Sequence, residues 1–367
     1  MPAYISSIGT VVPPTKINQA STAEFMTRHL GLDEDSQKLL AIIYRASGIQ
    51  YRHSVISDFA RSVKDFSFFP KNNSLEPFPK VGDRMRLYEQ EAIKLSMSAV
   101  KDCLPPGFDV STITHLITVS CTGMYAPGLD IELVEHLGLI SNIQRTSVNF
   151  MGCYAAFNAL KLANHIINND LSSNVLIVAT ELCSIHILKS NDEDSLLSNA
   201  LFGDGSAAVL VQAEQSKIAQ LELTAFYADL APKGKDAMAW KIGDYGFEMK
   251  LSKEVPEVIK EGIGELTHKL LSSLQLTVAD IDQFAIHPGG KRILEVIEQE
   301  LRISKKQNAP AYEVLRDFGN MSSPTVLFVL KSILIGLDTD NHKDKILSFA
   351  FGPGLTLESL LLTVKQP

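Results

Sequence analysis

Apolar residues recur along the chain in two patterns. Continuous apolar runs, typical of buried strands, occupy Ser111–Ser120 and Asn174–Glu181. Between them, Cys153–Asn168 carries apolar residues such as Phe157 and Leu160 at the spacing of one buried helix face. Strands that alternate with helices predict an α/β protein with a mixed, mostly parallel sheet that is covered on both sides.

The second half of the chain repeats this order of elements. The segment MGCYAAFNAL at Met151–Leu160 can be laid on FGNMSSPTVL at Phe318–Leu327, so that Gly152–Cys153 matches Gly319–Asn320. The tripeptides TIT and DID, each followed by an apolar strand, are related by nearly the same offset. A duplicated α/β unit explains both matches. We expect the two halves to be 1–215 and 216–367, with their boundary at 214–217.

Three residues become candidates for chemistry through this duplication. If the halves pack about a pseudo-twofold axis, their equivalent helix starts meet, and Cys153 and Asn320 become neighbours. His287 follows the strand Phe284–Ile286 and enters the turn PGG. Ligand crevices of open α/β sheets form at such carboxyl ends of strands.

Each candidate also has a purely structural interpretation. A helix start lowers the pKa of a cysteine and favours its reactivity, yet Cys153 is equally a small residue that packs tightly there. His287 is either a residue that satisfies a turn or a donor to a substrate oxygen. Asn320 is a good helix N-cap, and its amide could also donate to an oxyanion.

Composition and charge exclude several classes of function. The chain is 45% hydrophobic and 21% charged, as in an ordinary globular protein, and its net charge is −8. No basic run is long enough to neutralise a nucleic-acid backbone, so no nucleic-acid partner is expected. The N-terminus does not resemble a secretory signal, and the apolar stretch Thr325–Leu337 is too short for a membrane span. A cytoplasmic enzyme fits best.

The four cysteines and the glycine-rich turns exclude other chemistry. The cysteines are widely scattered, without a CxxC pair or zinc-ligand spacing, so neither a disulfide nor a metal is expected. Neither GDG at Gly203–Gly205 nor FGPG at Phe351–Gly354 has the GxGxxG spacing of a dinucleotide site. Hydride transfer therefore has no support.

Five motifs resemble a known family in their order along the chain. They are MGCYAA at Met151–Ala156, ALFGDGSAA at Ala200–Ala208, AIHPGG at Ala285–Gly290, GNMSS at Gly319–Ser323 and FGPGLTLE at Phe351–Glu358. The family is that of the type III polyketide synthases, which include the chalcone and stilbene synthases, within the thiolase superfamily. The likeness spans nearly the whole chain.

This resemblance implies a duplicated αβαβα thiolase fold, a homodimer and a catalytic triad. Cys153 would be the nucleophile that carries the acyl chain, with His287 and Asn320 holding the thioester oxygen. The substrates would be an acyl-CoA starter and malonyl-CoA, with no cofactor beyond these coenzyme A thioesters. Decarboxylative Claisen condensation would lengthen the starter, and the product would then cyclise.

The resemblance also implies which residues line the substrate pocket. Phe202 matches a gating phenylalanine of the family, and Met249 stands where the plant enzymes have a second one. Because methionine is flexible, the gate should be softer here. The loop Gly352, Pro353 and Gly354 would shape the cyclisation cavity.

Three further positions suggest a wider pocket than in the plant enzymes. Ala126 replaces a methionine, Cys121 replaces a threonine, and Cys183 falls at another pocket position. A smaller side chain frees apolar space, so we expect a medium- or long-chain fatty acyl starter and an alkylpyrone or alkylresorcinol product.

Some questions stay open from the sequence. Lys38, Arg45, Arg52, Lys291 and Arg292 are basic candidates for coenzyme A phosphates, but ordinary surface roles suit them as well. A ketoacyl synthase III-like enzyme, which condenses once with malonyl-acyl carrier protein, is the nearest alternative. A scaffold that binds acyl-CoA without condensing is a more distant one.

Overall fold

The computed structural model of the protein describes residues 2–213 and 218–366. The predicted boundary at 214–217 lies outside the described residues. The strands are β1 (Tyr4–Val11), β2 (Thr15–Asn18), β3 (Tyr51–Ser54), β4 (His115–Ser120), β5 (Gln144–Asn149), β6 (Asn174–Leu182), β7 (Asp204–Gln212), β8 (Gln220–Leu230), β9 (Met238–Ile242), β10 (Phe247–Leu251), β11 (Gln283–Ile286), β12 (Lys345–Gly352) and β13 (Thr356–Lys365). The helices are α1 (Gln19–His29), α2 (Glu34–Ala46), α3 (Val81–Cys103), α4 (Leu129–Leu137), α5 (Ala155–Asn169), α6 (Glu193–Leu201), α7 (Val255–Ser272), α8 (Lys291–Leu301), α9 (Ala309–Phe318) and α10 (Thr325–Ile335).

One mixed sheet repeats the same strand order on both sides of its centre. Within the described ranges it has 9 strands in the order β11-β12-β13-β8-β1-β7-β6-β4-β5. From the central antiparallel pair β8 and β1, each side continues with two antiparallel pairings and then a parallel one. The sequence pattern does not reveal these central antiparallel pairs, because buried strands of either kind are apolar. The mirrored order confirms the predicted duplication.

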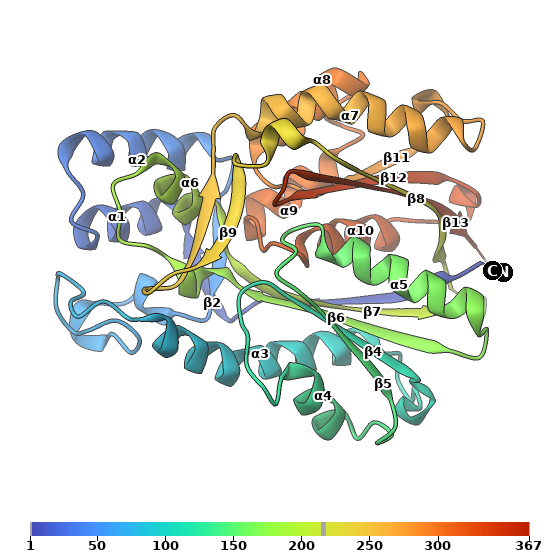
Figure 1. Ribbon diagram of the computed structural model, residues 1–367, viewed down its shortest axis with the longest axis horizontal. Coiled ribbons are helices and arrows are strands. Elements are labelled where there is room, and N and C mark those ends of the chain that lie inside the picture. The colour runs from blue at the N-terminus through green and yellow to red at the C-terminus, as the bar shows by residue number, and fades with distance from the viewer. Residues whose placement is uncertain (1, 214–217, 367) are drawn as a thin grey trace.

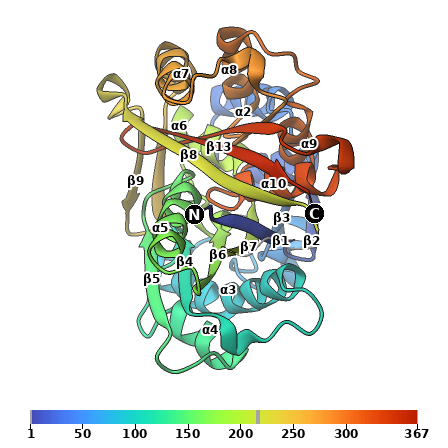
Figure 2. The same cartoon turned by 90° about the vertical axis from the view of Figure 1, so that its right-hand side faces the viewer.

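The two halves of the sheet lie in separate layers (Figure 1). Helices α5 and α10 lie between the layers, while α7 and α8 cover one outer face and α3 and α4 cover the other. Figure 2 shows the same stacking from the side. Helix α5 contacts strands of both halves, including β6 and β13. The chain therefore has the five-layer α/β architecture expected of a duplicated unit.

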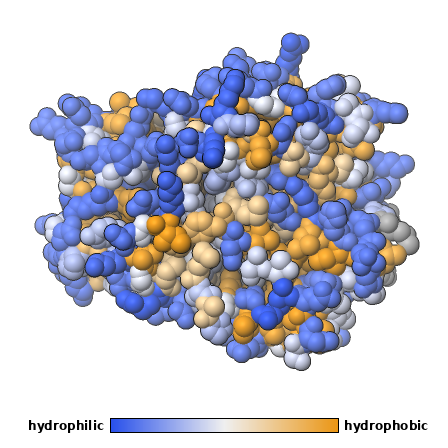
Figure 3. Space-filling view, viewed as in Figure 1, coloured by the Kyte–Doolittle hydropathy of each residue, from blue (hydrophilic) through white to orange (hydrophobic). Residues whose placement is uncertain are grey.

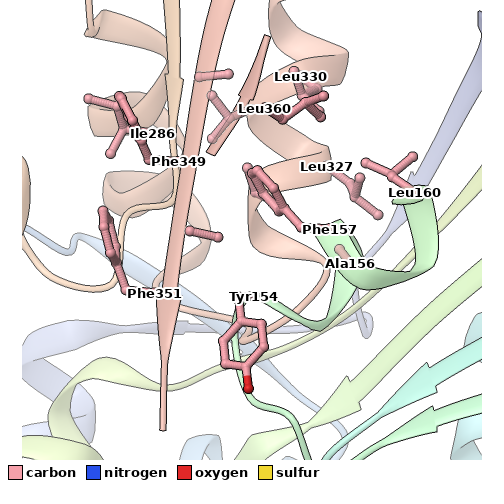
Figure 4. Packing of buried hydrophobic residues seen from close by; sticks show 14 of the residues in the cluster. Tyr154, Ala156, Phe157, Leu160, Ile286, Leu327, Leu330, Phe349, Phe351 and Leu360 are labelled. Atoms are coloured by element: carbon pink, nitrogen blue, oxygen red, sulfur yellow. The ribbon is translucent and has the colours of Figure 1, made fainter. Parts of the chain in front are cut away.

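The central helices are held by apolar packing. Figure 4 shows Phe157 and Leu160 of α5 close to Leu327 of α10, and all three are buried in one cluster. Each such side chain contributes about 1.5–3 kcal/mol when it leaves water. This packing fixes the start of α5 relative to the segment that precedes α10.

The glycines aligned by the duplication both have a positive φ. Gly152 has φ +82 and Gly319 has φ +71, both in the left-handed region that favours glycine. Each glycine directly precedes a candidate site residue, Cys153 or Asn320. The alignment of the two halves thus extends to the local turn.

Three expectations about element boundaries are corrected. The strand expected from Ser111 begins at His115, because Val110–Thr112 forms a short 3₁₀ turn. The helix expected from Cys153 begins at Ala155. The cap of α10 is Pro324, so Asn320 lies before the helix rather than capping it.

Two further findings concern membranes and metals. In the residues that the structure describes, no helix is both long and apolar enough to cross a membrane. Within the same residues, no group of three or more His, Cys, Asp or Glu side chains is arranged to hold a metal ion.

Candidate active site

Cys153 lies in a tight turn between β5 and α5. Gly152 makes this turn possible, since a Cβ atom there would lie 2.3 Å from Cδ of Pro353. The N–H of Gly152 donates to Sγ of Cys121 at 2.9 Å. Cys153 itself is buried, with 6% of its surface exposed. The turn therefore packs Gly152, directly before Cys153, against the FGPG loop of the other half.

Asn320 occupies the equivalent position in the second half. Its Oδ1 accepts the N–H of Ser322 at 2.8 Å and lies 3.9 Å from Sγ of Cys153. Its Nδ2 donates to the carbonyl of Gly289 at 3.3 Å. Because an amide nitrogen carries two N–H groups, the second one is available for a substrate oxygen.

His287 leaves β11 at the predicted strand end. The N–H of His287 donates to the carbonyl of Phe349 on β12 at 2.8 Å, which fixes its backbone. Its side chain is buried, and neither ring nitrogen has a hydrogen-bond partner among the described residues. Buried polar groups are normally paired, and exceptions often mark functional sites.

The three candidates meet in one cavity, which we call the inner cavity. Its walls include Cys153, His287 and Asn320, and its volume is about 20 Å³. The remaining wall residues are Gly152, Phe202, Met238, Met249, Leu251, Gly289, Ile293, Phe351 and Pro353. Apart from the three candidates, these side chains are apolar, so the cavity favours uncharged groups.

Burial dominates the protonation of the site. It raises the pKa of the Cys153 thiol to about 12, against the opposing hydrogen bonds with Ser322 and Asn320. Burial alone lowers the pKa of His287 to about 3. The expected lowering of the cysteine pKa at a helix start is therefore wrong, because α5 begins two residues later and desolvation outweighs it.

A second cavity adjoins the inner one, and we call it the side cavity. Its volume is about 40 Å³, and it shares Phe202 and Met249 with the inner cavity. An open groove of about 560 Å³ also includes Met249 in its wall, so Met249 borders all three spaces. The inner and side cavities are large enough for only a few water molecules, so side chains must move before an acyl chain can enter.

The predicted pocket residues separate into two groups. Cys121, Cys183 and Pro353 lie in the wall of the side cavity. Gly352 instead packs against Tyr154, where a Cβ atom would lie 2.5 Å from the ring. Gly354 turns the loop at φ +115, and neither glycine lines the two cavities.

Ala126 is not where the sequence placed it. It is exposed, and neither cavity includes it. Within one chain, its short side chain therefore adds no space to the pocket.

The structure adds pocket residues that the sequence did not single out. Trp240 of β9 lines the side cavity and donates from Nε1 to the carbonyl of Cys121 at 2.7 Å. His186 stacks on Phe247 with 4.2 Å between ring centroids and accepts the N–H of Phe247 at Nδ1. These contacts fasten the β9–β10 hairpin as one wall of the pocket. The only sequence signal was the single tryptophan of the chain.

A buried carboxyl group lies behind the cysteines. Glu181 accepts hydrogen bonds from the N–H of Cys121, the hydroxyl of Thr122 and the hydroxyl of Ser323. Burial raises the pKa of Glu181 despite these bonds. It joins β6 to the loops of both halves near the site.

The basic candidates for coenzyme A phosphates differ in exposure. Lys291 and Arg292 lie at the exposed start of α8, and both pair with Glu295. Lys38 pairs with Asp35 on α2. Arg52 is buried, so it does not face a ligand from the surface.

Two family sequence models match almost the entire chain. The model for chalcone and stilbene synthases, N-terminal domain, matches residues 1–215, and the one for the C-terminal domain matches residues 222–365. The chain belongs to the chalcone and stilbene synthase family. It is therefore a type III polyketide synthase, an acyltransferase that catalyses decarboxylative condensation. Enzymes of this family use acyl-CoA and malonyl-CoA as substrates.

Relatives of this synthase include proteins from bacteria and plants. It is 30% identical to the alpha-pyrone synthesis polyketide synthase-like Pks18 of Mycobacterium tuberculosis, over 99% of this chain and 91% of that protein. It is 26% identical to type III polyketide synthase C of Arabidopsis thaliana, over 98% of this chain and 94% of that one.

Solved structures confirm the thiolase fold. The crystal structure of PKS-I from the brown alga Ectocarpus siliculosus matches with a TM-score of 0.90 and 28% identity, over 100% of this chain and 98% of that one. The C-terminal type III polyketide synthase domain of Steely1 from Dictyostelium matches with a TM-score of 0.89 and 28% identity, over 99% of both chains.

Proposed function

We propose that this type III polyketide synthase loads a medium- or long-chain fatty acyl starter on Cys153 and converts it to an alkyl-substituted alpha-pyrone. His287 and Asn320 complete the catalytic triad. The observation that carries this assignment is the unpaired, buried imidazole of His287 in the same small cavity as Cys153 and Asn320. A buried polar side chain without a partner is costly unless a substrate group supplies one.

Loading begins with a proton transfer. His287 takes the proton of the Cys153 thiol, and the thiolate attacks the carbonyl carbon of the acyl-CoA. The bond from that carbon to the coenzyme A sulfur breaks, and His287 returns the proton to that sulfur, so that coenzyme A leaves as the thiol. Cys153 then holds the acyl group as a thioester.

Extension requires an enolate. Malonyl-CoA loses carbon dioxide, and the electron pair of the broken bond moves to the thioester oxygen. N–H donors of Asn320 and His287 stabilise that oxygen, each worth roughly 3 kcal/mol by comparison with other oxyanion holes. The enolate carbon attacks the Cys153 thioester and displaces the thiolate, so the chain grows by two carbons.

The walls of the side cavity support an aliphatic starter. Cys121, Cys183, Ile187, Leu188 and Phe247 give it a largely apolar lining, and such surface attracts alkyl chains. Pks18, whose name describes alpha-pyrone synthesis, supports the lactone product. Met249 borders every space on the way, and its flexible side chain suits a gate that opens for a chain.

Purified synthase tests this proposal without any carrier protein. Malonyl-CoA is combined with starters from acetyl-CoA to C16 acyl-CoA and with aromatic acyl-CoAs, and the products are identified by mass spectrometry. We expect C8–C16 starters to outcompete aromatic ones and to give pyrones. Cys153→Ala should fold and form no product. Preferred aromatic starters would refute the starter class, and resorcinols would refute the lactone product.

The same assay addresses the nearest alternative. A ketoacyl synthase III-like enzyme would extend the starter once and would need malonyl-acyl carrier protein. Products of several extensions from malonyl-CoA alone support the polyketide reaction over that alternative. A homodimer and a cytoplasmic location are further parts of the proposal.

A further inference from the structure

Arg52 on β3 is a buried cation that holds the end of another element. Only 5% of its surface is exposed. Its Nη1 donates to the carbonyls of Asn199 and Phe202, both at 2.7 Å. These carbonyls belong to the C-terminal end of α6, where backbone acceptors have no partner within the helix and where a cation is favoured.

The neighbouring carbonyls of α6 are taken as well. Nε2 of Gln19 donates to the carbonyl of Ala200 at 2.8 Å. The N–H of Asn320 donates to the carbonyl of Leu201 at 3.0 Å. The end of α6 is thus hydrogen-bonded both to the N-terminal segment, through Gln19, and to the segment that contains Asn320.

The residues that follow α6 also pair with the backbone of Asn320. The N–H of Gly203 donates to the carbonyl of Asn320 at 2.9 Å, and Phe202 and Asn320 form a parallel bridge. The stem of Arg52 packs beneath this bridge, since a Cβ atom on Gly319 would lie 3.0 Å from its Cγ. Arg52 therefore touches the chain on both sides of the gate residue and directly before Asn320.

The buried position of Arg52 has a free-energy cost. The hydrogen bonds of Arg52 go to uncharged oxygens, the two carbonyls and the hydroxyl of Tyr44. Among the described residues Arg52 forms no direct ion pair, and burial of such a cation costs free energy, which the electrostatic interaction with the buried carboxyl group of Asp204 offsets in part. The guanidinium offsets that cost in a useful way, because it holds the two carbonyls at the end of α6 in fixed positions.

We propose that Arg52 is a positioning residue, which sets the places of Phe202 and Asn320 around the reacting thioester oxygen. The inference rests on the proposed role of Asn320 in stabilising the enolate. Loading of Cys153 depends on the thiol and His287, whereas decarboxylation of malonyl-CoA depends on the Asn320 donor. Loss of Arg52 should therefore harm decarboxylation more than loading.

The decisive experiment is a double-mutant cycle. Decarboxylation is followed as acetyl-CoA formation from malonyl-CoA, and loading as the mass of the acylated protein. Asn320→Ala should lower kcat for decarboxylation roughly 100-fold. Arg52→Met, which keeps the stem but loses the donors, should lower kcat roughly 10-fold at unchanged KM, because small displacements at a site are costly. In the Asn320→Ala background, Arg52→Met should add less than about twofold, since coupled residues are not additive.

A second variant and a distant control keep the test interpretable. Arg52→Lys retains the buried charge, but its side chain is one bond too short to bring the ammonium to the position from which Nη1 contacts both carbonyls, so it should give an intermediate loss with the same non-additivity. This cycle replaces the first one if Arg52→Met does not fold. Asp58→Asn weakens another buried cluster, in which the carboxylate accepts the N–H groups of Ser67, Phe68 and Phe69. It should lower stability and leave decarboxylation by the folded protein unchanged.

The possible results separate the two proposals. Full additivity of Arg52 and Asn320 would overturn the positioning role alone. Equal losses of loading and decarboxylation in the Arg52 variants would also overturn it. Undiminished decarboxylation by Asn320→Ala would instead overturn the catalytic role that we assign to Asn320.

Discussion

At the scale of single residues, the central question is where the proton of Cys153 goes. Burial raises the pKa of the thiol to about 12 and lowers that of His287 to about 3, so each group alone is neutral at physiological pH. Transfer of the proton from sulfur to imidazole keeps the net charge of the cavity at zero. The attraction between the two resulting charges is strong in an apolar cavity. Protonated His287 is therefore the group that stabilises the Cys153 thiolate.

This argument predicts a pH dependence for alkylation of Cys153. In His287→Gln the proton has no acceptor, so burial should govern the thiol and keep the pKa of Cys153 raised. The rate of reaction with iodoacetamide should then be low at neutral pH and rise roughly tenfold per pH unit between pH 7 and about 9. With His287 present, the rate should be higher and nearly flat over this range. Equal slopes in the two proteins would contradict the ion pair, and Cys153→Ala gives the background.

At the scale of elements, the turn before α5 carries a second prediction. Gly152→Ala would place a methyl group 2.3 Å from Pro353 in a backbone conformation with φ +82. The conformation alone costs on the order of 1–3 kcal/mol, and the clash must displace Cys153 or the FGPG loop. We expect a lower free energy of unfolding and at least a roughly 100-fold slower loading of Cys153.

Gly107 offers a matched control for this variant. It has φ +80, and nothing lies within 4 Å of a Cβ atom built there. Gly107→Ala should therefore show the conformational cost without the clash, in denaturant unfolding measured alongside Gly152→Ala. Loading by Gly107→Ala should equal that of the parent. If both variants lost the same stability and the same activity, the contact with Pro353 would be irrelevant.

The elements nearest the site were also the most predictable from sequence. The strand before His287 and the helix after Cys153 were confirmed, because a buried helix face and a buried strand leave clear apolar spacings. The ends were less predictable. Asn320 looks like an N-cap by residue type, but its side chain accepts the N–H of Ser322, and α10 starts only after Pro324.

The rest of the pocket depends on contacts that leave no local pattern. Trp240 enters the wall because a hairpin folds back onto Cys121, and Arg52 reaches α6 from a strand far earlier in the chain. A basic residue in a polar segment is ordinarily exposed, so burial of Arg52 could not be foreseen. Ala126 lies outside both cavities of the single chain for a related reason, because a residue close in sequence to a pocket residue can still point away from the pocket.

At the scale of the whole molecule, the duplication explains both the meeting of the triad and its asymmetry. Gly152 and Gly319 both have a positive φ and directly precede the aligned residues Cys153 and Asn320. A nucleophile follows one glycine, and an amide follows the other. The second half also lacks an equivalent of β5, because its sheet ends at β11 in the described part of the chain. Only the first half therefore carries this extra strand at its edge.

The edge strand β5 is the feature on which the proposed homodimer rests. Its residues are mostly exposed, and among the described strands only β4 pairs with it. Figure 3 shows apolar side chains gathered over the part of the surface where α5 lies, and Leu162 and Ile166 of α5 are only half-buried. An unpaired strand edge beside an apolar surface is suited to a second copy of the chain.

We predict that the synthase is a dimer and that Ser147→Pro weakens it. The N–H groups of Gln144 and Phe150 point towards β4, so by alternation the N–H of Ser147 faces the open edge. Proline removes that donor and blocks strand pairing at the edge. Analytical ultracentrifugation should show a dimer for the parent and at least a roughly tenfold weaker dimer for Ser147→Pro, a change of about 1.4 kcal/mol.

Ser147→Ala loses the same hydroxyl bond to Thr118 but keeps the N–H, so it should remain dimeric. Dimers of equal strength in all three proteins would place the interface away from β5.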